Sequence, residues 1–377
     1  MGLRVGVIGV GVISGIYFHN DKLFRDFSIT ACADLVPELA QNAADAQGIK
    51  ALSVDDLLAD DEIDAVLNLT VPIAHAQVSR KALEAGKHVY SEKPLATDLS
   101  DGVALQALAN ERGLRIGVAP DTVLGSGVQT ARRLIDEGVV GRPLSMTAAV
   151  MSHGMEAWHP NPHFFFQPGA GPVLDIGPYY ISTLINLLGP VERVFASSQI
   201  PFAERIVTSE SPHKGERITV NTPTTVHAIL NFASGVQGTF MTSWDVWKHG
   251  LSPIEIYGEK VSLSVPDPNF FSGMVGIGRE RFGPWDQIDV RDCVFGAWNW
   301  PVDNPNRANY RGLGLAEMAA AIEAGRPHRV SGDVALHTLA VMLGILKSAE
   351  TGQPQDVGHA CAQPEPLSED EAKTLLA

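Results

Sequence analysis

A glycine-rich turn near the start of the chain constrains the fold more than any other feature. The segment Leu3–Ile8 is apolar and rich in β-branched residues, as expected of a strand buried on both faces. Gly9-Val10-Gly11-Val12-Ile13-Ser14 follows directly, and a helical pattern continues toward Phe24. A strand, a tight glycine turn and a helix in this order predict the first βα unit of a parallel sheet.

The same alternation continues through the first third of the 377 residues. The apolar runs predict strands, and helical patterns separate them. The strands are Ser28–Ala33, Asp64–Leu69, His88–Tyr90 and Arg115–Ala119, and the helices include Ala74–Ala85 and Leu99–Arg112. Repeated units of this length predict a Rossmann domain over residues 1–122, an α/β fold with a doubly wound parallel sheet and helices on both faces.

The pattern changes after residue 122, and a chain of 377 residues favours a second domain. We expect an α+β domain with a largely antiparallel open sheet over residues 123–358. Its predicted helices are Val123–Glu137, Asp175–Leu188, Leu315–Ala324 and Val334–Ser348, and its strands are Leu144–Met151, Glu192–Ser198, Thr224–Phe232, Val236–Ser243, Ile254–Tyr257 and Val261–Val265. Residues 266–310 are interpreted as ordered loop, and residues 359–377 as a peripheral acidic tail.

Charge and cysteine content argue against several classes of function. With 28 Lys and Arg against 43 Asp and Glu, the net charge is −15, which disfavours general binding of nucleic acid or anionic membranes. Three scattered cysteines do not make a disulfide framework, so a reduced, cytoplasmic protein is expected. We find neither a signal-peptide pattern nor an uninterrupted apolar stretch of membrane-spanning length.

The glycine turn also has the pattern of a dinucleotide-binding loop. In Gly9-x-Gly11-x-x-Ser14 the first glycine allows the tight turn. The second lets the backbone, including Val12 and Ile13, approach a pyrophosphate. A simple tight βα turn is the alternative, but the position at the first βα junction favours dinucleotide binding.

An acidic residue, Asp34, ends the second predicted strand and indicates which dinucleotide binds. A carboxylate there accepts hydrogen bonds from ribose hydroxyls and repels a 2′-phosphate. The next residue is Leu35, and not an arginine that could hold that phosphate. We therefore predict NAD as the cofactor. Asp34 could also serve as a helix N-cap before Pro37.

The segment Glu92-Lys93-Pro94 follows a predicted strand at its carboxyl end, where ligands bind in open α/β sheets. Together with the glycine turn and an Asp175-x-x-x-Tyr179 motif, it resembles the glucose–fructose oxidoreductase/inositol dehydrogenase (Gfo/Idh/MocA) family. The resemblance covers nearly the whole chain. It implies an NAD-dependent oxidoreductase that acts on a ring carbinol of a sugar, a sugar derivative or a cyclic polyol, and a homodimer or homotetramer that pairs through its second sheet.

The resemblance implies that Lys93 lies beside the nicotinamide and the reacting carbinol, with Asp175 as the second catalytic element. The family commonly has His four residues after this Asp, whereas Tyr179 stands here, as in members resembling dimeric dihydrodiol dehydrogenase. Tyrosine, with a pKa of about 10, is a poor base at neutral pH, but an adjacent ammonium would lower that value. From the residues alone, an N-cap and a core tyrosine explain the motif equally well.

Further cofactor and substrate contacts are assigned in the same way. Thr70, Pro72 and His75 match a family segment that touches the dinucleotide, and Glu92 is assigned to the cofactor as well. On the substrate side we assign Lys93, Asp175, Tyr179, Asp121 at the end of the last strand, and His153, Trp158 and His159. Aromatic faces beside hydrogen-bonding groups suit a sugar ring, although they could also fill a small core under a loop.

Three nearby histidines, His153, His159 and His163, raise the question of a metal site. Two prolines between them and the lack of a nearby cysteine argue against one, so we predict no metal. Two alternative functions remain open. One is an enzyme that cleaves glycosides through transient oxidation by bound NAD, and the other is a non-catalytic NAD-binding regulator.

Overall fold

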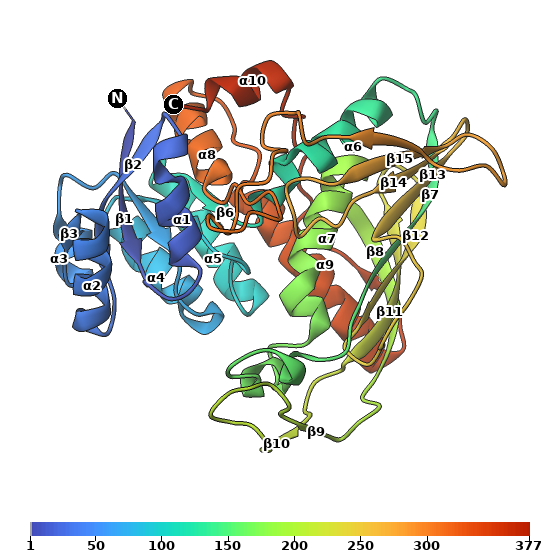
Figure 1. The fold of residues 1–377 in the computed structure, drawn as a ribbon, viewed down its shortest axis with the longest axis horizontal. Helices are drawn as coiled ribbons and strands as arrows, with labels where there is room; N and C mark the ends of the chain where they lie inside the picture. Colours follow the sequence, from blue (N-terminus) through green and yellow to red (C-terminus); the bar gives the residue numbers. More distant parts are fainter. Residues whose placement is uncertain (1) are drawn as a thin grey trace.

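Two sheets organise the chain in the computed structural model, which describes residues 2–377 (Figure 1). The first has six strands in the order β3-β2-β1-β4-β5-β6, all paired in parallel. The second has nine strands in the order β16-β15-β14-β13-β7-β12-β11-β8-β17, and β7 pairs with β12 in parallel within an otherwise antiparallel sheet. The predicted fold class is confirmed.

Short apolar strands and the helices between them form the Rossmann domain. The strands are β1 (Leu3–Ile8), β2 (Phe27–Ala33), β3 (Lys50–Ala51), β4 (Ala65–Asn68), β5 (His88–Ser91) and β6 (Ile116–Val118). The helices are α1 (Ser14–Asn20), η1 (Asp21–Leu23), α2 (Pro37–Gln47), α3 (Val54–Ala59), α4 (Pro72–Glu84) and α5 (Leu99–Glu111). The sequence analysis missed β3 and α3, because neither is long enough to show a periodic pattern.

Helices cover one face of the second sheet. The strands are β7 (Pro143–Met151), β8 (Val191–Gln199), β11 (Thr225–Phe232), β12 (Gln237–Ser243), β13 (Ile254–Gly258), β14 (Ser262–Val265), β15 (Met274–Gly278), β16 (Asp286–Asp289) and β17 (Gln355–Asp356). Helices α6 (Ser126–Asp136), α7 (Pro172–Leu188) and α9 (Gly332–Thr351) pack on this domain. In Figure 1, α7 and α9 lie on one side of the strands. On the other face, the side chains of Phe195 and Ile229 are exposed.

The interpretation of residues 266–310 as loop is wrong, because strands β15 and β16 extend the sheet there. Strand β15 contains two glycines, which are weak strand formers. A Cβ at Gly276 or Gly278 would lie 3.1 or 3.0 Å from the ring of Trp285. The indole therefore occupies the space that side chains at these two glycines would need. The sequence pattern does not show this contact.

The expectation of a peripheral tail is also wrong. The last helix, α10 (Glu369–Thr374), packs on the Rossmann domain, where Leu367 and Leu375 are buried in the same core as Phe24. The acidic residues between Leu367 and Leu375 gave this segment the sequence pattern of an exposed tail. Helix α8 (Leu313–Glu323) returns to the same domain and packs against β6 and η2 (Asp121–Leu124). Segments from the end of the chain thus complete the first domain.

One helix in the described part of the chain, α9, is long and apolar enough by composition to cross a membrane. Its 18-residue apolar window is 56% buried within the structure. The helix contacts β8, α7 and α5, so it lies between the two domains. Burial in this shared core is sufficient to explain its apolar composition.

A small lobe lies below the second sheet in Figure 1. It contains η3 (Met155–Ala157), η4 (His163–Phe166) and the two-stranded sheet of β9 (Glu204–Ile206) and β10 (Arg217–Thr219). Its core packs Phe166 against Trp244. The buried guanidinium of Arg205 pairs with the carboxylates of Glu156 and Asp245, which fixes the lobe to the end of β12.

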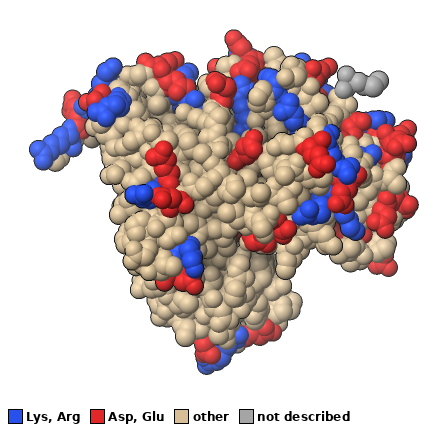
Figure 2. Space-filling view, turned by 180° about the vertical axis from the view of Figure 1, so that it is seen from behind, with Lys and Arg blue, Asp and Glu red and all other residues tan. Residues whose placement is uncertain are grey.

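Charged groups of both signs share the surface. On the face opposite to that of Figure 1, Lys and Arg side chains lie beside Asp and Glu side chains, and broad areas between them are uncharged (Figure 2). This mixed distribution keeps basic charge on that face locally neutralised.

Candidate active site

The carboxyl edge of the six-stranded sheet has the geometry of a pyrophosphate site. At Gly9 φ is +94°, and a Cβ there would lie 2.9 Å from the backbone carbon of Leu69, so only glycine fits. At Gly11, by contrast, a Cβ would meet no other protein atom within 4 Å. The Oγ of Ser14 donates to the carbonyl of Gly11 at 2.8 Å and closes the turn. Open space beside the backbone of this turn is what a bound pyrophosphate requires.

Asp34 stands at the end of β2 with its carboxylate fixed by the backbone. Its Oδ2 accepts from the amide of Val10 at 2.9 Å, and its Oδ1 accepts from the amide of Val36 at 3.0 Å. Each carboxylate oxygen has a further lone pair, and the side chain is partly exposed. The carboxylate is therefore held beside the glycine turn and can accept hydrogen bonds from ribose hydroxyls.

Three apolar side chains at this edge are exposed to an unusual extent. Val12 is fully exposed, Leu35 is 93% exposed and Ile73 is 82% exposed. Apolar side chains grouped around a cleft provide a surface for flat rings. The sequence analysis assigned Val12 to the cofactor but did not assign Leu35 or Ile73 as contacts. The sequence signal for Leu35 was an apolar residue directly after Asp34 at a strand end, and for Ile73 an apolar residue in the first turn of the helix that follows a strand.

The segment after β4 is ordered by a buried histidine. Thr70 donates its hydroxyl to Asn68 Oδ1 at 2.7 Å. The ring nitrogens of His75 lie 2.7 Å from the carbonyl of Pro94 and 2.9 Å from that of Thr70. Because His75 is only 1% exposed, we correct its predicted role: it positions two loops and does not contact the cofactor itself. Pro72 is exposed in the first turn of α4, as a cofactor contact would be.

Lys93 and Asp175 meet where the two domains join. The Nζ of Lys93 donates to Asp175 Oδ1 at 2.9 Å and to the carbonyl of Asp175 at 2.7 Å. It also lies 5.3 Å from the ring centroid of Tyr179. The structure therefore brings together all three residues that the sequence analysis predicted as catalytic, from the end of β5 and from α7.

The surroundings of Lys93 keep it charged. Burial lowers the pKa of Lys93, but the carboxylate of Asp175, with smaller effects of Tyr179 and Glu92, raises it more, so the net pKa lies above its ordinary value. Two of its three N–H donors are directed at Asp175. Lys93 is thus a fixed cation with one donor left for another group, and not a proton acceptor.

The start of α7 determines where Asp175 and Tyr179 lie. The helix begins with Pro172 after Gly171, whose carbonyl accepts from the amide of Asp175 at 3.0 Å. Tyr179 follows one turn later, so both side chains point to the same side of the helix. Tyr179 is 7% exposed and also belongs to the core of the second domain. The two interpretations of this tyrosine, core residue and site residue, are therefore compatible.

Arg311 is a second cation beside Tyr179 that the sequence analysis missed. Its Nη2 donates to the hydroxyl of Tyr179 at 3.4 Å, and its Nη1 donates to Asn309 Oδ1 at 2.8 Å. Burial lowers the pKa of Arg311, but Tyr179, Glu92 and other acidic neighbours raise it above its ordinary value. Arg311 lies in the loop before α8, 132 residues after Tyr179, and no local motif marks it.

Glu92 is a buried support of the site. Its Oε1 accepts from the hydroxyl of Tyr17 at 2.9 Å, and its Oε2 accepts from the amide of Lys93 at 3.2 Å. The side chain is 8% exposed and holds the loop that carries Lys93, and its role in cofactor binding stays a prediction.

Asp121 does not form part of the open site, which corrects its predicted role as a substrate contact. It is 1% exposed, and its Oδ2 accepts from the amides of Gly312 and Gly314 at 2.9 and 3.1 Å. It therefore anchors the start of α8. Burial raises the pKa of Asp121 to about 6, although the two amide hydrogen bonds and Arg311 counteract part of that effect.

The predicted substrate residues His153, Trp158 and His159 lie in the small lobe. His153 stacks on Trp247 with ring centroids 3.6 Å apart, and Trp158 is 64% exposed. His159 accepts from the amide of Asn161 through Nδ1 at 3.1 Å. The lobe connects to α7 because the carbonyl of Phe165 accepts from the amide of Gly171 at 3.1 Å. Their contact with substrate stays a prediction.

Comparisons with known proteins agree with this geometry. Residues 3–119 match a family model described as "Oxidoreductase family, NAD-binding Rossmann fold", and residues 128–264 match the GFO/IDH/MocA C-terminal domain. An uncharacterized oxidoreductase of Schizosaccharomyces pombe is 25% identical over 93% of this chain and 98% of its own length. A 1,5-anhydro-D-fructose reductase of Ensifer adhaerens is 27% identical over 82% of this chain and 84% of its own.

A solved structure shares the fold over nearly the whole chain. Levoglucosan dehydrogenase in complex with NADH and levoglucosan superposes with a TM-score of 0.79 at 22% identity. The superposition covers 95% of this chain and 100% of that one. The turn at Gly9 and Gly11, the carboxylate of Asp34 and the three exposed apolar side chains beside them fit NAD, which agrees with the predicted cofactor.

Proposed function

This chain belongs to the GFO/IDH/MocA family of NAD-binding oxidoreductases, and we propose that it transfers hydride between nicotinamide and a ring carbinol of a sugar, a sugar derivative or a cyclic polyol. The observation that carries the proposal is the placement of Lys93. Its ammonium is bonded to Asp175 and lies 5.3 Å from the ring of Tyr179 at the carboxyl edge of the sheet. A charged donor beside a phenol at this edge suits oxidation of an alcohol.

The relatives support a carbohydrate substrate. One of them is named for reducing 1,5-anhydro-D-fructose, and a structural neighbour has been crystallised with levoglucosan. Both ligands are cyclic and carry carbinol groups or the ketone derived from one. The aromatic side chains Trp158 and Trp247 are exposed in the lobe, where they could pack on the C–H faces of such a ring.

The proposed chemistry assigns one role to each of the site residues. Bound NAD supplies the hydride acceptor. Tyr179 takes the proton of the carbinol as general base, and it lies beside the cations of Lys93 and Arg311. The free N–H of Lys93 donates to the carbinol oxygen, and Asp175 keeps the ammonium in place. In the reductive direction Tyr179 returns the proton.

A turnover assay tests this proposal. Inositols, aldoses, anhydrosugars and glycosides are each incubated with the enzyme and NAD, while NADH absorbance and sugar products are followed. Accumulation of NADH with an equal amount of ketone supports the dehydrogenase. Sugar cleavage without net NADH would support a glycoside-cleaving enzyme instead. Tight NAD binding without turnover of any compound would favour a regulator, and Lys93→Met is the inactive control.

We also propose a reducing, cytoplasmic location. Cys32, Cys293 and Cys361 are all free thiols in the structure. Burial raises the pKa of Cys361 to about 11, so this thiol stays protonated and unreactive at neutral pH. Such cysteines suit a compartment that keeps thiols reduced.

A further inference from the structure

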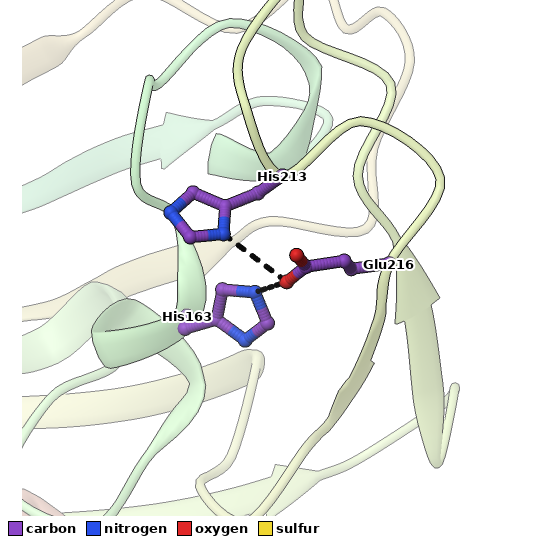
Figure 3. Close-up of side chains that lie close together, drawn as sticks. All are labelled: His163, His213 and Glu216. Carbon is purple, nitrogen blue, oxygen red and sulfur yellow. Dashed lines mark hydrogen bonds and ion pairs between the residues drawn. The ribbon is translucent and has the colours of Figure 1, made fainter.

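A cluster of two histidines and one glutamate lies in the small lobe (Figure 3). The Oε2 of Glu216 is 2.8 Å from His163 Nε2 and 3.1 Å from His213 Nδ1. All three atoms lie within 4.8 Å of one another. Among residues 2–377, no other group of three His, Cys, Asp or Glu side chains brings its donor atoms this close. The dehydrogenase chemistry proposed above uses none of these residues.

We propose that His163, His213 and Glu216 bind a zinc ion, with water as the fourth ligand. Two imidazoles and one carboxylate form a donor set that suits zinc, whereas Mg²⁺ and Ca²⁺ prefer oxygen donors only. In a tetrahedral site with bonds of about 2.0–2.1 Å, neighbouring donor atoms are about 3.4 Å apart. The distances from Glu216 to the two rings therefore need to widen by well under 1 Å, which small side-chain rotations provide.

The backbone holds two of the donors in place before a metal binds. The amide of Glu216 donates to the carbonyl of His213 at 3.0 Å, and the carbonyl of Glu216 accepts from the amide of Val207 at 2.9 Å. Gly215, with φ of +87°, makes the tight turn between them and donates to the carbonyl of Val207 at 2.8 Å. Metal binding therefore costs little conformational entropy at His213 and Glu216, because the backbone already holds them together.

Charge and exposure at the cluster are compatible with metal binding. One oxygen of the Glu216 carboxylate faces a ring nitrogen of each histidine, so an ion between them would have three donor atoms from the protein. The three side chains are 35–50% exposed, which leaves an open approach for the ion and its water. The nearby ammonium of Lys214 is paired with Glu210 and so repels a cation less.

A zinc ion here would connect the lobe to the candidate active site. His163 begins η4, and two residues later the carbonyl of Phe165 accepts from the amide of Gly171. Gly171 in turn accepts from the amide of Asp175 at the start of α7. The ion would fasten η4 to the turn at His213, and thereby stiffen the segment that leads to Asp175. This role is structural and separate from hydride transfer.

The sequence analysis considered His163 only together with His153 and His159, and it predicted no metal for that group. The structure instead pairs His153 with Trp247 and sets His159 against Phe165. The partner Glu216 comes 53 residues after His163, on the turn before β10. Such spacing is far longer than the local motifs by which zinc sites are recognised in sequences.

Zinc binding to the full chain tests the proposal directly. Protein stripped with a chelator is titrated with ZnCl₂ by calorimetry, and bound metal is counted after dialysis. We expect one zinc per chain in the wild type. In His213→Ala and Glu216→Gln the affinity should fall about tenfold or more. His249→Ala removes an exposed histidine elsewhere and should bind as the wild type does.

Two further measurements distinguish a specific zinc site from weak binding to the protein surface. Cobalt substitution should give the strong visible bands of tetrahedral Co²⁺ in the wild type and in His249→Ala only. Zinc should raise the melting temperature of those two proteins, but not of the two cluster variants, because binding stabilises the folded state. Equal zinc affinity in wild type and His213→Ala, or no melting shift in the wild type, would overturn the proposal. None of these readings depends on turnover, so they leave the proposed dehydrogenase function untouched.

Discussion

Lys93 donates two hydrogen bonds to Asp175, one to the carboxylate at 2.9 Å and one to the main-chain carbonyl at 2.7 Å. The two residues come from different domains and are 82 positions apart. The carboxylate supplies the charge that keeps Lys93 protonated, while the carbonyl fixes where the ammonium points. One contact therefore joins the domains and places a cation beside Tyr179.

We expect Asp34 to determine cofactor choice. Wild-type protein should bind NAD(H) more tightly than NADP(H), because the carboxylate repels a 2′-phosphate. The double variant Asp34→Ser, Leu35→Arg should shift the preference toward NADP by about tenfold or more, because it removes that repulsion and adds a phosphate partner. Dissociation constants from cofactor fluorescence check this. Equal or tighter binding of NADP by the wild type would contradict it.

Arg311 should affect turnover through its hydrogen bond to Tyr179. In Arg311→Met the donor that lies 3.4 Å from the hydroxyl of Tyr179 is lost, so turnover should fall. Arg311→Lys keeps a charged donor, and its turnover should lie between those of Arg311→Met and the wild type. Turnover and melting temperature are measured for both variants. If Arg311 only supports the fold, Arg311→Met will lower the melting temperature while the folded enzyme turns over as the wild type does.

Asp121 should make stability depend on pH. Burial raises its pKa from 3.8 to about 6 in the folded state, so the folded protein binds a proton between about pH 4 and 6 that the unfolded chain does not. Stability should therefore decrease as pH rises through this window. The difference between a pKa of 3.8 and one of about 6 means that the free energy of unfolding is about 3 kcal/mol lower at neutral pH than below pH 4.

The isosteric variant Asp121→Asn isolates this effect. Its amide oxygen can still accept from Gly312 and Gly314, but it has no charge to bury. At pH 7 the variant should be more stable than the wild type, and its stability should vary less between pH 4 and 6. Urea unfolding at several pH values measures both quantities. A variant that is less stable than wild type at pH 7 would show that the charge of Asp121 is needed.

The uncovered face of the second sheet should form a subunit interface. Phe195 and Ile229 are paired neighbours on β8 and β11, and they are 41% and 45% exposed. Light scattering at micromolar concentration should show a dimer or a tetramer. Ile229→Lys should shift it toward monomer, whereas Val302→Lys, at an exposed apolar residue in a loop, should not. A wild-type monomer would contradict this prediction.

Strands with strong apolar runs could be predicted from the sequence, and so could the residues at their ends. The predicted strand Leu3–Ile8 coincides with β1, because β-branched residues buried on both faces leave a clear signal. Lys93 and Asp175 could be found because each stands in a local motif. Strand β15 could not, because its glycines are explained only by the packing of Trp285.

Two residues, Asp121 and Arg311, owe their roles to partners that are distant in the sequence. Asp121 has the sequence pattern of a polar residue at a strand end, but its partners Gly312 and Gly314 lie at the start of α8, about 190 residues later. Arg311 directly precedes α8, and it contacts Tyr179 because α8 packs on the first domain. No periodicity or spacing reports a contact of this kind, since it depends on how the second half of the chain returns to the first.

The most direct test of the account is turnover by Tyr179→Phe, measured together with its NAD affinity. This substitution keeps the ring in the core and removes only the hydroxyl. On a substrate that reduces NAD, turnover should fall by about 10²–10⁴, the usual contribution of general acid–base catalysis, while the dissociation constant for NAD should stay unchanged. Turnover close to that of the wild type would contradict the account and remove Tyr179 from the proton transfer.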